Sequence, residues 1–63
     1  MPQLTQMELN TIKELALLED VNAKKFQLYA QNCQNNQLQT MFTQEAHRSL
    51  NNTSMLMNFL KSQ

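Results

Sequence analysis

The chain of 63 residues contains no glycine and no tryptophan, and it has one proline, one cysteine and one histidine. Without glycine, a glycine-rich phosphate-binding loop cannot form, which excludes nucleotide enzymes of that kind. The single cysteine, Cys33, cannot form an internal disulfide, and the single histidine, His47, cannot complete the Cys–His sets of common zinc sites. We therefore expect a protein that is not an enzyme and that holds neither a metal nor another cofactor.

Charge of either sign is also scarce. Five Lys and Arg balance five Asp and Glu, so the formal net charge is zero, and Lys24–Lys25 is the only adjacent basic pair. Such a chain lacks the basic surface that binds nucleic acid or anionic membranes. No apolar run approaches the ~20 residues of a membrane span, and residues 1–6 lack the features of a secretory signal. We expect a soluble, intracellular protein with neither nucleic acid nor membrane as partner.

The first clear positive signal is a helix start near the N-terminus. Thr5 and Glu8 have the spacing of a capping box, in which each side chain accepts a hydrogen bond from the other residue's backbone N–H. Leu4 and Leu9 occupy the two positions of a hydrophobic staple around that cap. The pattern predicts a helix over about residues 6–33.

The apolar rhythm breaks once, at residues 32–36, and resumes at Leu38. Asparagine tolerates both the left-handed exit of a helix and the N-cap conformation of the next. Either Asn35 or Asn36 can start the second helix, and with Asn36 as the cap Gln39 falls at the partner position of a capping box. The second helix is predicted over about residues 37–60. A break this short predicts an antiparallel helical hairpin, and residues 1–63 form a single domain.

Apolar residues line more than one side of these helices. The first helix carries one apolar face through Ala16 and Ala23 and a second, nearly opposite, through Leu17 and Val21. Because one partner helix cannot cover both, we predict that two hairpins dimerise into an all-α, ferritin-like four-helix bundle, with a second copy or a related helical hairpin as partner. The residues predicted for the core and the dimer interface are Ile12, Leu15, Leu17, Val21, Phe26, Leu28, Leu38, Met41, Phe42, Leu56 and Phe59.

Polar residues interrupt the apolar stripes near the middle of both helices. Glu19 lies on the stripe of the first helix, and Glu45, Ser49 and Asn52 interrupt that of the second. Buried polar groups need hydrogen-bond partners, and such groups can fix the register between helices. We predict a buried polar layer built from these four residues. Replacing Asn52 with leucine is then expected to keep or raise stability while loosening register.

Several short motifs over about residues 15–60 resemble the short ferritin-like proteins of endospore-forming bacteria related to the Coat F spore-coat family. The matching residues are Leu17, Leu18, Glu19, Asp20, Lys24, Lys25, Tyr29, Leu38, Phe42, Ala46, Leu56, Met57, Asn58, Phe59 and Leu60. The resemblance implies a structural protein of the spore coat or of sporulation, located in the forespore or spore coat. It also implies a ferritin-like bundle, in which the corresponding ligand positions here hold Lys24, Ser49 and Asn52.

Those three residues offer neither carboxylate nor imidazole to a metal ion. A di-iron bundle site also uses Glu-x-x-His, whereas Glu45 is followed by Arg48 at that position, and His47 points about 200° away around the helix. One alternative stays open, namely a ferritin-like metal or redox protein in which a dimer brings Glu19 and Glu45 together as a carboxylate-only site. A second alternative is a small helical adaptor or regulator that uses the methionine-rich second helix as a partner groove.

Overall fold

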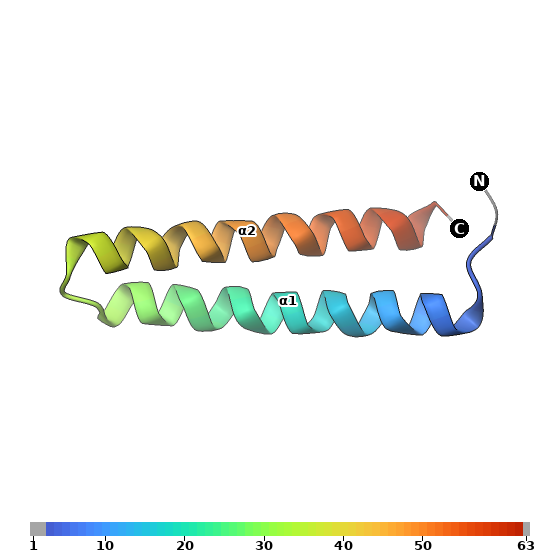
Figure 1. The fold of residues 1–63 in the computed structure, drawn as a ribbon, viewed down its shortest axis with the longest axis horizontal. Coiled ribbons are helices and arrows are strands. Elements are labelled where there is room, and N and C mark those ends of the chain that lie inside the picture. The colour runs from blue at the N-terminus through green and yellow to red at the C-terminus, as the bar shows by residue number, and fades with distance from the viewer. Residues whose placement is uncertain (1–2, 63) are drawn as a thin grey trace.

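Two long α-helices lie side by side and antiparallel in the computed structural model (Figure 1), which describes residues 3–62. Helix α1 spans Gln6–Asn32 and helix α2 spans Asn36–Lys61. The Cα atoms extend over 47 × 16 × 12 Å, so the hairpin is a single layer with two broad faces. The predicted all-helical hairpin is confirmed, and each helix boundary lies within one residue of its predicted position. Neither helix is long and apolar enough to cross a membrane within the described part of the chain.

The start of α1 is fixed by the capping box that the sequence predicts. The Glu8 backbone N–H donates to Thr5 Oγ1 at 3.1 Å, and the Thr5 backbone N–H donates to Glu8 Oε1 at 2.9 Å. Hydrogen bonding to the carboxylate, from the Thr5 backbone N–H first and from the Thr5 side chain second, lowers the pKa of the Glu8 carboxyl from its ordinary value of 4.5. Because the pKa is lowered on folding, the contact stabilises the helix above the ordinary carboxyl pKa and is lost as pH falls through the lowered value.

Replacing Thr5 with alanine should destabilise the protein by about 0.5–2 kcal/mol, because the N-cap acceptor disappears. Thr43→Ala is the matched control, since the Thr43 hydroxyl donates only to the Gln39 carbonyl within α2, at 2.8 Å, and should cost little. The measurement is thermal unfolding followed by circular dichroism. Equal melting temperatures for the two variants would show that the cap does not stabilise α1.

The turn between the helices uses no left-handed residue. Cys33 ends α1 at φ −91°, ψ 129°, and no residue of 3–62 has a positive φ, so the left-handed exit expected of asparagine is not used. Of the two N-caps left open, the structure has Asn35, whose Oδ1 accepts from the Leu38 backbone N–H at 3.0 Å. Gln39 is therefore not a capping-box partner. Its Nε2 donates to the Ala30 carbonyl at 3.0 Å and caps the last turn of α1 instead.

The seam between the helices is lined by small side chains. Ala16, Ala23 and Ala30 recur at seven-residue spacing, which keeps them on one side of α1, and all three are buried. Ala46 and Ser49 are the buried residues of α2. Small side chains at a contact let two helices pack at the shorter end of the usual 8–10 Å range. The larger side chains Ile12, Phe26, Phe42 and Leu56 flank the seam and are half-buried.

Several residues predicted for the core or dimer interface do not lie in the core of the single hairpin. Leu15 precedes Ala16 by one residue, which rotates it about 100° off the seam, and it is exposed. The others that remain exposed are Leu17, Val21, Leu28, Leu38, Met41 and Phe59. Their place in a dimer interface stays a prediction.

Candidate functional site

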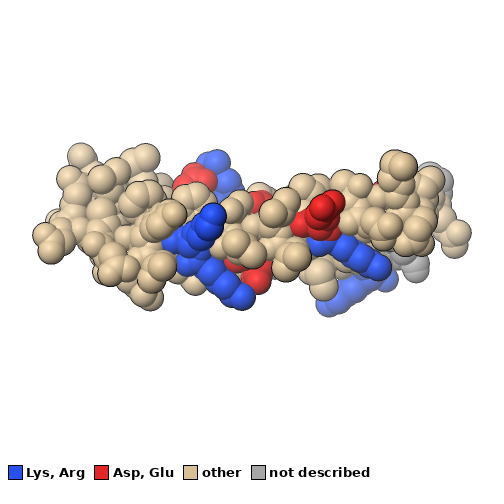
Figure 2. Space-filling view, turned by 90° about the horizontal axis from the view of Figure 1, so that it is seen from below, with Lys and Arg blue, Asp and Glu red and all other residues tan. Residues whose placement is uncertain are grey.

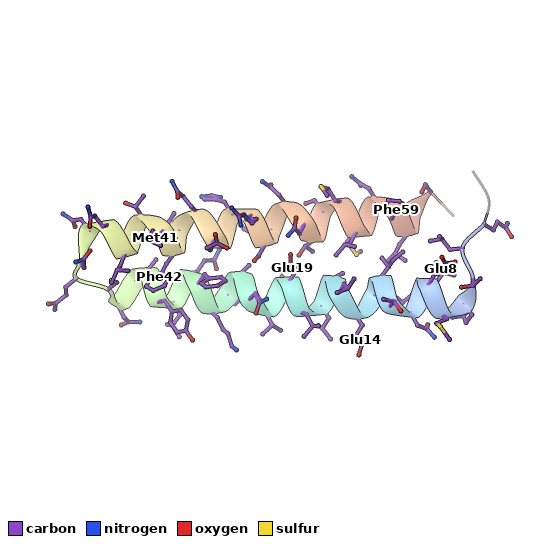
Figure 3. The ribbon with its side chains drawn as sticks, viewed as in Figure 1. Glu8, Glu14, Glu19, Met41, Phe42 and Phe59 are labelled. Carbon is purple, nitrogen blue, oxygen red and sulfur yellow. The ribbon has the colours of Figure 1, made fainter. Side chains whose placement is uncertain are left out.

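A polar contact joins the two helices at the middle of the hairpin (Figure 3). Asn52 Nδ2 of α2 donates a hydrogen bond to Glu19 Oε2 of α1, and both side chains are partly buried. Figure 3 labels Glu19, whose side chain points from α1 toward α2. Ser49, one turn before Asn52, is the one buried polar residue among those described, at 5% exposure. No buried side-chain nitrogen or oxygen atom within residues 3–62 lacks a hydrogen bond. The site therefore fixes the relative position of the helices without leaving an unsatisfied polar group.

Glu45 lies on α2 one turn before Ser49, near the polar contact between the helices, but its side chain does not reach across to α1. Its side chain is 42% exposed and pairs with Arg48 Nη1 of the same helix at 3.5 Å. An exposed pair of this kind contributes roughly 0–1 kcal/mol. Of the four residues predicted for a polar layer, Glu19, Ser49 and Asn52 lie at the helix–helix contact, and Glu45 lies at its edge.

The residues at the ligand positions implied by the Coat F resemblance make other interactions. Lys24 pairs with Asp20 one turn earlier on α1, at 3.1 Å. Asn52 donates to Glu19, and Ser49 packs into the seam. Among the residues that the structure describes, no group of three His, Cys, Asp or Glu is close enough to hold a metal ion. A carboxylate-only site would need side chains from a second chain.

One broad face of the hairpin carries a shallow groove near the loop, which we call the glutamine groove. It is lined by Gln27, Gln31, Thr43, His47 and Leu50, together with the edges of two buried alanines. The lining places no thiol or carboxylate beside His47, and its one hydroxyl, that of Thr43, donates to the Gln39 carbonyl at 2.8 Å. The groove presents amides and a hydroxyl, which suit solvent contact.

An aromatic cluster lies on the other broad face, at the same end of the hairpin. Phe42 of α2 is 6.4 Å from Phe26 and 5.6 Å from Tyr29, between ring centroids, and Phe26 and Tyr29 meet edge to face at 6.2 Å. Tyr29 is two residues from both Gln27 and Gln31, which places it about 200° around α1 from the groove. The predicted interface omitted Tyr29. Its i, i+3 spacing from Phe26 is the signal in the sequence that could have included it.

The loop end of the hairpin is also free of charge. No Lys, Arg, Asp or Glu occurs in residues 26–44, and Figure 2 shows this end as a continuous uncharged surface, with the charges gathered over the middle and the opposite end. Large apolar side chains are exposed there, among them Leu28, Tyr29, Leu38 and Met41. This end therefore combines apolar side chains with neutral amides.

Comparison with known proteins adds no assignment, because no family model, no curated protein and no solved structure matches this chain.

Proposed function

We propose that this protein is a non-enzymatic structural or assembly protein, in which two hairpins associate into a four-helix bundle. One observation carries the proposal, namely that within residues 3–62 the buried residues are four alanines and one serine. Thirteen large apolar side chains of the described residues remain more than a third exposed. They are Met7, Leu15, Leu17, Leu18, Val21, Leu28, Tyr29, Leu38, Met41, Leu50, Met55, Met57 and Phe59.

The energetics of a single hairpin favour this proposal. Fixing the backbone of each residue costs roughly 1–2 kcal/mol, and burial of large apolar side chains, at ~25 cal/mol per Å², is the main term that offsets it. An alanine seam supplies little of this burial. A broad face of 47 × 16 Å is roughly 750 Å² in projection, which matches the ~800 Å² that each partner buries in a stable dimer. A second copy therefore has enough surface to supply the missing burial.

The cellular setting that we propose rests on the sequence resemblance alone. A hairpin similar to the Coat F proteins would serve in a spore coat or another sporulation structure, where a self-associating element without catalysis contributes to assembly. An adaptor role is a second candidate. Its support is the exposure of Met41, Met55 and Met57 on α2, since flexible methionine side chains suit binding of a partner helix.

The solution mass, measured together with metal content on the same sample, tests this proposal. Sedimentation equilibrium at micromolar concentration should give a dimer, twice the 7.4 kDa of the chain, and protein purified with added iron or manganese should carry no stoichiometric metal. A cooperatively folded monomer would contradict self-association. Bound metal that survives dialysis and is lost on Glu19→Ala or Glu45→Ala would instead favour the carboxylate-only metal site.

A further inference from the structure

The exposed apolar residues of α1 divide between the two broad faces. Leu17 precedes Gln31 of the glutamine groove by fourteen residues, two seven-residue repeats, and therefore lies on the groove side. Leu15 precedes Tyr29 by the same fourteen residues and lies on the side of the aromatic cluster. Leu18 is one turn after Leu15 and extends that side. Two adjacent leucines, Leu17 and Leu18, thus belong to different faces.

Helix α2 divides in the same way. Thr43 and Leu50 line the groove, and Met57 follows Leu50 by seven residues. Met41 is two residues before Thr43 and Met55 two before Met57, so each lies about 200° around α2 from the groove side. Leu38 is one turn before Met41 and adjoins it. We call the surface formed by these side chains the aromatic face. It comprises Leu15, Leu18, Tyr29, Leu38, Met41 and Met55.

The charged residues that α2 places on the aromatic face lie near its centre. On α1, Glu8 and Thr11 lie seven residues before Leu15 and Leu18 and add polar groups near the N-terminal end of this face. Glu45 and Arg48 lie between Met41 and Met55 along α2, next to the Glu19–Asn52 contact. Apolar side chains flank this centre toward both ends. The groove face instead carries amides and hydroxyls near the loop, and the Asp20–Lys24 ion pair is on its side, because Lys24 precedes Gln31 by seven residues. The groove face also exposes apolar side chains, namely those of Leu17, Val21, Leu28, Leu50 and Met57. Burying this face would nevertheless desolvate its amides, hydroxyls and ion pair without offering them partners.

We infer that the partner is a second copy of this chain, that it packs against the aromatic face, and that the groove faces of both copies stay in solvent. This choice of face leaves Leu17, Val21 and Leu28 outside the interface for which the sequence predicted them. This inference rests on the proposed self-association. The aromatic face suits a self-complementary contact, because a twofold axis brings the same patch of both copies together. The polar centres of the two copies then meet, and the Arg48 guanidinium, already paired with Glu45 of its own chain, gains a carboxylate of the second copy. The apolar ends are covered at the same time.

Two matched pairs of substitutions test which face is used. Leu18→Lys and Leu17→Lys change adjacent leucines of similar exposure, 55% and 65%, on the aromatic and groove sides respectively. Met55→Lys and Met57→Lys form the corresponding pair on α2. The dimer dissociation constant, from sedimentation equilibrium, should rise at least about tenfold for Leu18→Lys and Met55→Lys, and stay within about threefold for the other two.

The opposite pattern, or a dimer that tolerates all four lysines, would overturn the choice of face while leaving self-association intact. A wild-type chain that stays monomeric would contradict the proposed function itself and would leave the face to a different helical partner. A second measurement, the alkylation rate of an introduced cysteine, tests the same choice of face if the lysine variants fail to fold. In a Cys33→Ser background, Leu18→Cys should react more slowly with iodoacetamide as protein concentration rises, and Leu17→Cys should not. Equal protection of both thiols would also overturn the inference.

Discussion

Replacing Ala23 with leucine should lower the free energy of unfolding by about 1–3 kcal/mol, because the added methylenes have no space in the seam. Ala23 is 1% exposed and sits midway between two other buried alanines of α1. A larger side chain there must push α2 outward or adopt a strained rotamer. For a domain of this size the melting temperature should fall by roughly 4–8 °C per kcal/mol.

Glu14→Leu is the control for the added apolar volume. Glu14 points away from α2 (Figure 3) and is exposed, so leucine there meets only solvent and should change stability by less than about 0.5 kcal/mol. The measurement is chemical unfolding at one fixed protein concentration, since association would otherwise shift the apparent stability. An Ala23→Leu variant as stable as the wild type would mean that the helices are not held at close approach.

Asn52→Leu should destabilise the protein by about 1–3 kcal/mol, because it leaves the partly buried Glu19 carboxylate without its hydrogen-bond donor. This expectation reverses the one drawn from the sequence, which did not identify the residue that Asn52 contacts. The double variant Glu19→Leu, Asn52→Leu removes both polar partners and should recover most of the loss, since apolar replacement of a buried polar pair is often neutral or stabilising.

A double-mutant cycle over Glu19 and Asn52 measures this coupling directly. Strictly additive losses would show that the two side chains do not depend on each other. The double variant should also sample several alignments of α1 against α2, because it lacks the polar contact that favours one alignment over its neighbours. Poorer dispersion of the amide resonances in nuclear magnetic resonance spectra would show this.

The features that sequence predicts best here are those set by local chemistry. The Thr5–Glu8 box depends on residues three apart, and it fixes the start of α1 without reference to the rest of the fold. The hairpin follows from one short polar break between two periodic segments. In both cases nearby residues supply all the interactions that decide the outcome.

Features that depend on the contact between helices were harder to predict. Leu15 and Ala16 are both apolar, and only the rotation of α1 against α2 makes Ala16 buried and Leu15 exposed. Asn35 is the N-cap because the turn between the helices is extended. The same turn lets the Gln39 side-chain amide donate to the Ala30 carbonyl. Likewise, Glu19 and Asn52 are 33 residues apart, so no local pattern identifies them as partners.

The absence of charge from residues 26–44 gives the two ends of the molecule different responses to salt. All ten charged residues lie outside that stretch, and at 0.1 M ionic strength their interactions are screened beyond about 10 Å. At the loop end there is nothing for ions to screen, and excluded salts such as sulfate strengthen apolar contacts. Added salt therefore weakens the ion pairs along the charged part of the hairpin. The apolar contacts at the uncharged loop end stay as strong as before, or become stronger.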